Sequence, residues 1–122
     1  MQTADLRTFL TERLQAICPR TYYGNAPASA DFLYLVWNLE AVSYEEGFSL
    51  QELEVDTVDY GSDTAPAEAM ADLVQASLHN LHQLTDSFFV AIYRERRQPL
   101  YENDKSVIRR RLTFQVRLHE RS

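Results

Sequence analysis

The sequence has one cysteine, three glycines and four prolines among 122 residues. Cys18 has no second cysteine to pair with, so no internal disulfide can stabilise the chain. Few glycines and prolines leave little of the chain for loops, and we expect mostly regular structure. The apolar run at residues 32–37 is far shorter than the roughly 20 residues of a membrane-spanning helix. The first residues lack the layout of a signal peptide, so we expect a soluble chain made in the cytoplasm.

Signatures of catalytic chemistry are missing as well. The sequence has no glycine-rich phosphate loop, no nucleophile elbow and no cysteine–histidine spacing of a zinc site. His79 and His82, with Asp86 as a third ligand, come nearest to a metal site, but this spacing is more typical of exposed histidines at a helix end. Glu68 and Asp72 are more typical of a solvated helix face than of a catalytic pair. We therefore predict no catalytic residue, no metal and no cofactor, and a protein that is not an enzyme.

Charge is distributed unevenly along the chain. The total is −6, but residues 1–93 hold three basic against 14 acidic residues, a net charge of −11. Residues 94–122 hold nine basic against four acidic residues, a net charge of +5. A basic end on an acidic body suits either nucleic-acid binding or association between copies. The arginines of this end lack the interleaved aromatic residues of a nucleic-acid stacking surface, which favours association.

Hydrophobic periodicity predicts an α+β fold. Apolar residues at spacings of three and four predict helices over residues 4–17 and 65–82, the second burying Met70, Leu73, Val74 and Leu78. Residues 21–23 suit a short strand, and long strands are predicted over residues 32–40, 49–60, 87–95 and 107–118.

These elements predict a single domain over residues 1–122. Two amphipathic helices would pack on one face of a mostly antiparallel, two-layer sheet of about four long strands, leaving the other face open. The predicted order is helix, three strands, helix and two strands. Residues 94–106 are expected to form a protruding charged loop.

Two rows of opposite charge follow from the alternation of the strands. The acidic row consists of Glu52, Glu54 and Asp56, and the basic row of Arg109, Arg111 and Arg117. If their strands are neighbours, the rows form cross-strand pairs within one chain. If the acidic row of one copy meets the basic row of the next, the contact is head-to-tail and can close a ring. The sequence alone does not decide between these two interpretations.

The layout resembles the tail terminator, or tail-completion, proteins of long-tailed bacteriophages and prophages. The resemblance rests on the order and spacing of elements over nearly the full chain. It includes the first helix with Tyr22, Tyr23 and Pro27 after it, and the aromatic strand at 32–37. It also includes the strand at residues 53–60, which leads into the second helix, and the closing stretch at residues 104–117. The sequence departs from the family at Asp31, where we would expect a proline.

The resemblance implies a virion structural protein at the junction of tail and neck. Such a protein would form a ring, expected to be a hexamer, on the last ring of the tail-tube protein. It would end tube growth and present a surface to a head-completion or connector protein, while DNA passes only through the lumen. The acidic and basic rows are then the candidate subunit interface. The candidate docking residues in the predicted loop are Arg96, Arg97, Leu100 and Tyr101.

Two other functions agree with the same sequence. One is another neck component, such as a head-closure protein. The other is a small bacterial adaptor that binds a peptide or ligand on its open sheet face and stays monomeric or dimeric. We expect no membrane partner for the tail protein.

Overall fold

The computed structural model describes residues 2–45 and 47–120. The elements in chain order are α1 (Gln2–Ile17), β1 (Thr21–Tyr23), β2 (Tyr34–Glu45), β3 (Phe48–Tyr60), α2 (Ala65–Leu78), β4 (Leu81–Leu84), β5 (Phe88–Leu100) and β6 (Val107–Glu120). Among the described residues, neither helix is long and apolar enough to cross a membrane.

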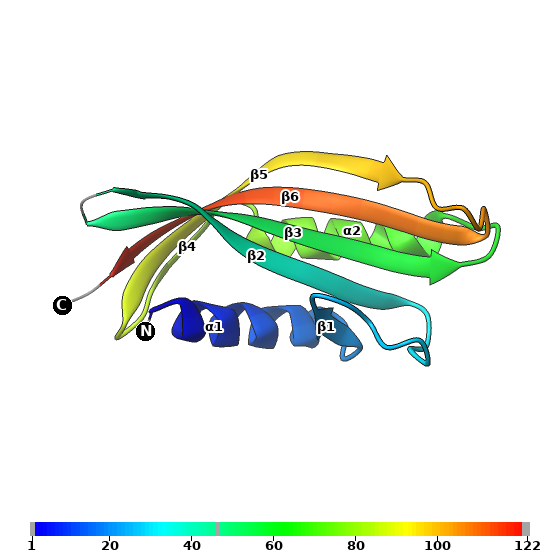
Figure 1. The fold of residues 1–122 in the computed structure, drawn as a ribbon, viewed down its shortest axis with the longest axis horizontal. Helices are drawn as coiled ribbons and strands as arrows, with labels where there is room; N and C mark the ends of the chain where they lie inside the picture. The colour runs from blue at the N-terminus through cyan, green and yellow to red at the C-terminus, as the bar shows by residue number, and fades with distance from the viewer. Residues whose placement is uncertain (1, 46, 121–122) are drawn as a thin grey trace.

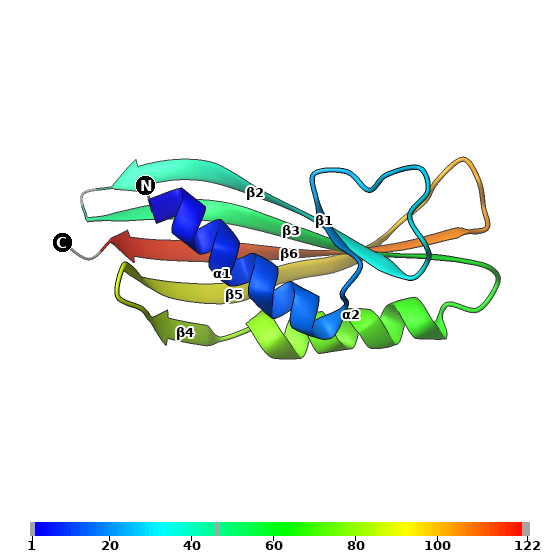
Figure 2. The ribbon, with the colours of Figure 1, turned by 90° about the horizontal axis from the view of Figure 1, so that it is seen from below.

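The six strands form one sheet in the order β1-β2-β3-β6-β5-β4. β1 pairs with β2 in parallel, and every other neighbouring pair is antiparallel. The sheet is long, strongly twisted and curled, and both helices lie on the same side of it (Figures 1 and 2). The predicted α+β class, with two helices on a mostly antiparallel sheet, is confirmed.

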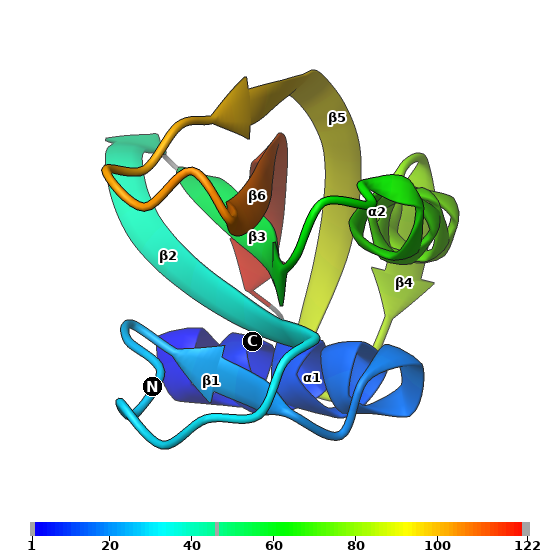
Figure 3. The same cartoon turned by 90° about the vertical axis from the view of Figure 1, so that its right-hand side faces the viewer.

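The core lies between the helices and the facing side of the sheet (Figure 3). The strand register determines which side chains point into this core, because directly opposed residues of antiparallel strands share a face. Leu53 of β3 is opposite Phe114 of β6, and both are fully buried. Leu10 of α1 joins the same cluster, and Phe9 meets Phe88 edge-to-face at 5.9 Å between ring centroids.

The second helix ends earlier than predicted and is followed by an unpredicted strand. Residues 79–82 continue the helical spacing in the sequence, but α2 stops at Leu78 and Asn80 turns the chain with a φ of 60°. Asparagine tolerates this left-handed conformation better than most residues. β4 then pairs with β5, so His82 lies in a strand and not at a helix end.

The buried stripe of α2 is also rotated from the predicted one. Ala67, Ala71, Val74 and Leu78 are buried at spacings of four, three and four. Leu73, which was predicted to face the core, is 56% exposed. Small alanines take the core positions because the helix packs closely on the sheet.

The predicted loop over residues 94–106 is shorter in the structure. β5 continues to Leu100, which pairs in register with Arg109, so only residues 101–106 connect β5 to β6. A bulge between Arg94 and Arg96 interrupts the pairing. Pro99 is tolerated because β4 pairs only with the first part of β5, leaving the later part on the edge of the sheet.

The two leucines of α2 give a matched test of this packing. Leu78→Ala leaves a cavity in the core, so we expect it to lower the free energy of unfolding by about 3 kcal/mol. Leu73→Ala removes an exposed side chain and should change it by less than about 0.5 kcal/mol. Urea unfolding of both variants measures the difference, and equal losses would show that the assigned helix face is wrong.

Candidate interaction surface

The open face of the sheet, on the side away from the helices, carries the two charged rows. β3 and β6 are neighbours, and their register places Asp56 directly opposite Arg111. The acidic and basic rows therefore lie side by side in one chain. The cross-strand interpretation of the sequence is correct for the centre of the rows.

Asp56 forms the centre of an ion cluster. Its residue surface is only 2% exposed, although it lies on the open face, because two arginines cover it. Arg111 donates from Nε at 2.9 Å and from Nη2 at 3.0 Å to the two carboxylate oxygens. Arg109 Nη2 lies 2.6 Å from Oδ2 of Asp56. The hydrogen bond with Asp56 raises the pKa of Arg111 above its ordinary value, against the opposing effect of burial.

The cluster reaches outward through weaker, partly exposed pairs. Arg109 Nη1 lies 3.4 Å from Glu102 of the 101–106 turn, and Arg111 Nη1 lies 3.7 Å from Glu54. Glu52 pairs with Arg96 at 4.0 Å. Pairs this exposed contribute at most about 1 kcal/mol each. Asp56 and its two arginines therefore hold the sheet together, while Glu52 and Glu54 are accessible to a partner.

Arg117, the last member of the basic row, forms no ion pair with any carboxylate in the part of the chain that the structure describes. Its guanidinium lies over the ring of Phe48, 4.8 Å from the centroid. That stacking leaves the charge at the surface, where Arg117 is exposed. Of the six interface candidates, Glu52, Glu54 and Arg117 are the most accessible, and their role between subunits stays a prediction.

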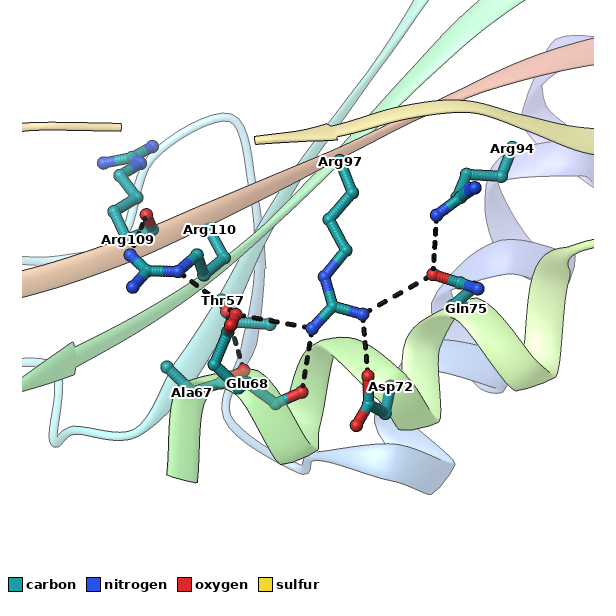
Figure 4. A network of polar contacts seen from close by, with 9 residues as sticks. All are labelled: Thr57, Ala67, Glu68, Asp72, Gln75, Arg94, Arg97, Arg109 and Arg110. Atoms are coloured by element: carbon teal, nitrogen blue, oxygen red, sulfur yellow. Dashed lines mark hydrogen bonds and ion pairs between the residues drawn. The ribbon is translucent and has the colours of Figure 1, made fainter. Parts of the chain in front are cut away.

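The docking candidates divide between the two faces of the sheet. Arg97 points toward α2, where its Nη1 lies 2.7 Å from Asp72 and its Nη2 lies 3.3 Å from Glu68 (Figure 4). Burial alone would lower the pKa of Arg97, but the hydrogen bonds and charges of Asp72 and Glu68 together raise it above its ordinary value. Arg96 and Tyr101 are exposed, Tyr101 by 90%, and Leu100 is half-buried.

A polar network fixes α2 to the sheet through three strands (Figure 4). Arg110 of β6 donates to Glu68 at 3.1 Å, next to the two bonds from Arg97 of β5. Thr57 of β3 donates to the carbonyl of Ala67 at 3.2 Å. The spacing of Glu68 and Asp72 was interpreted as a solvated face, because the sequence does not show that β5 and β6 pass above this helix.

The histidines make local contacts. His79 Nδ1 accepts the backbone N–H of Arg94 at 3.0 Å, and His82 Nε2 lies 2.8 Å from the hydroxyl of Tyr93. Over residues 2–45 and 47–120, no group of three or more histidine, cysteine, aspartate or glutamate residues is arranged to hold a metal ion.

Substitution of Asp56 tests how much the ion cluster contributes to the stability of the fold. Asp56→Ala leaves two partly buried arginines without their carboxylate, so we expect the free energy of unfolding to fall by about 3 kcal/mol. Glu102→Ala, which removes an exposed partner of the same cluster, should cost less than about 1 kcal/mol. Urea unfolding separates the two, and a small loss for Asp56→Ala would contradict a structural role for the cluster.

Comparison with known proteins identifies the family. Residues 2–119 match the family described as "Tail completion protein gp17". None of the curated proteins that we compared matches the chain. A solved chain from "Virion of native gene transfer agent (GTA) particle" shares the fold, with a TM-score of 0.70 and 16% sequence identity over 87% of this chain and 84% of that chain. Because the family match spans nearly the whole sequence, this chain belongs to the tail completion protein gp17 family, and it is a structural tail protein and not an enzyme.

Proposed function

We propose that the protein caps the tail tube as a ring, ends tube polymerisation and provides the surface to which the head is joined. The observation that carries this proposal is the family match over residues 2–119, since a tail-completion protein acts when the tail is finished. The mechanism is geometric: each copy binds the last ring of tail-tube protein and offers the next tube subunit no matching surface. We propose a hexamer, in keeping with the resemblance noted from the sequence.

The accessible charges of the open face supply one proposed contact between copies. Glu52 and Glu54 of one copy would meet Arg117 of the next, while the Asp56 cluster stays within each chain. The acidic body of the protein, with a net charge of −11 over residues 1–93, also suits a lumen through which DNA passes without binding.

One end of the molecule is suited to docking on the tail-tube protein or on a connector protein. Tyr101 stands exposed on the 101–106 turn. Tyr60 pairs in register with Val107, the first residue of β6 after that turn, and its ring lies 5.5 Å from that of Phe32. Phe32 and Tyr60 are also exposed. Exposed aromatic side chains that gather at one end of a protein are typical of a protein–protein contact.

Loss of the protein tests the proposed function in the particle. We expect particles assembled without it to carry tails of uncontrolled, excessive length that are not joined to heads, because nothing stops tube growth. Electron microscopy measures tail length and head attachment. Tails of normal length without heads would assign the protein to head joining alone, and normal tails joined to heads would refute the proposal.

A charge reversal tests the proposed contact between copies. Arg117→Glu should weaken assembly at low salt, because it places an acid opposite an acidic neighbour, and adding Glu52→Arg should partly restore it. Arg94→Glu makes the same charge change on the helical side, where Arg94 faces Gln75 of α2, and should have no effect. Sedimentation at low and high salt measures assembly, and a ring unaffected by Arg117→Glu would remove Arg117 from the interface.

A further inference from the structure

Part of β2 is an unprotected edge of the sheet. β1 covers only the first part of β2, pairing in register with Leu35 to Trp37. The hydroxyl of Tyr23 extends the cover to Leu39, donating to its carbonyl at 3.1 Å and accepting its N–H at 3.3 Å. Beyond this point, no strand of the described chain lies beside residues 40–44. Their outward backbone groups are therefore open to another strand.

The other edge of the sheet is formed by β4 and, beyond it, by the later part of β5. β4 is the last strand of the sheet and pairs on one side only, with β5. The later part of β5, which β4 does not cover, is a poorer edge for pairing. A bulge interrupts it between Arg94 and Arg96, the N–H of Arg94 is bound by His79, and Pro99 has no N–H. The two accessible edges, residues 40–44 of β2 and Leu81–Leu84 of β4, lie at the same end of the molecule (Figure 2).

Both edges carry exposed apolar side chains. Val42 and Tyr44 of β2 are 63% and 69% exposed, and Leu84 of β4 is 59% exposed. Natural proteins usually protect edge strands with charges, prolines, bulges, short strands or covering elements, since an open apolar edge pairs with other chains. Here that protection is partial: Glu40 is a charge and Ala41–Ser43 a bulge, but apolar side chains remain exposed beside them. A bulge between Ala41 and Ser43 limits how far a ladder can extend here, which suits a strand as short as β4.

The directions of the two edges define how copies can pair. Each step from β2 through β3, β6 and β5 to β4 is antiparallel, so β2 and β4 run in the same direction (Figure 2). When the rotation axis runs roughly along the strands, a second copy brings its β4 beside β2 as a parallel strand. Such a contact joins two different surfaces, so it is head-to-tail and closes a ring when the rotation closes.

We infer that β4 of one copy pairs in parallel with residues 40–44 of β2 in the next copy, so that one sheet continues from copy to copy. β1 already pairs in parallel with the first part of β2. The incoming β4 would lie next to it along the same side of β2, in the same direction. The contact would cover Tyr44 on the helix-facing side and Leu84 on the open side of the joined sheet, because register places Tyr44 opposite Ser49 and Leu84 opposite Phe89. This inference rests on the proposed ring and names the strands that form it.

Cross-linking between introduced cysteines tests the inference in the full-length chain. Val42→Cys with Leu84→Cys, treated with a short bismaleimide, should give a ladder of covalent multimers up to the size of the ring on a denaturing gel. Each single variant should stay monomeric. Cys18 is buried, so the unsubstituted chain should give no product. Val42→Cys with Leu73→Cys is the matched control, because Leu73 is equally exposed but lies on α2, and it should give no ladder.

Each outcome decides between specific alternatives. Dimers from either single variant would show a two-fold contact between identical edges and overturn the inference. A ring that sediments normally but gives no ladder would overturn the edge pairing and leave the ring itself standing. A chain that forms no ring by itself or with tail tubes would overturn both.

Discussion

The pairing of β3 with β6 joins residues that lie between 47 and 71 positions apart in the sequence and aligns them over the full length of β3. On one face this pairing places Leu53 against Phe114 and creates the core that both helices cover. On the other face it places Asp56 between Arg109 and Arg111. A slip of one residue would reverse both faces, moving the apolar side chains into solvent and the charges against the helices. The core and the ion cluster therefore depend on the same register.

The ion cluster also determines which charged groups of the open face are available to bind a partner. A buried carboxylate held by two arginines contributes little to binding, because it is already desolvated and paired. The accessible groups are at the margins of the face and at the sheet edges. Assembly through backbone edges needs no match of charge, whereas a charged contact weakens with salt. The two proposed contacts are thus physically distinct, and they can be separated by experiment.

Much of the fold could be predicted from the sequence. α1 and the four long strands follow from apolar spacing, and the family resemblance followed from their order. The structure differs where a local conformation overrides the pattern. At Asn80 a left-handed turn ends α2 and begins β4. At residues 94–100 a charged stretch with a proline is a strand, since β6 supplies the pairing partner.

The candidate site was less predictable, for a physical reason. Alternation along each strand indicates which charges share a face, but not which strands are neighbours or in what register. The sequence therefore left the pairing of Asp56 with Arg111 open. The binding of Arg97 to Glu68 was missed for the same reason, because it needs the packing of β5 over α2. Contacts between distant segments become visible only once the strands are aligned.

The account depends on copies of this chain assembling at the end of a tail tube. The most direct measurement is an electron-microscopy reconstruction of the protein mixed with tubes of its tail-tube protein. The account predicts a single closed ring of this chain at one end of each tube, with the sheet passing from subunit to subunit. Bare tube ends, or the chain distributed along the tube wall, would contradict it.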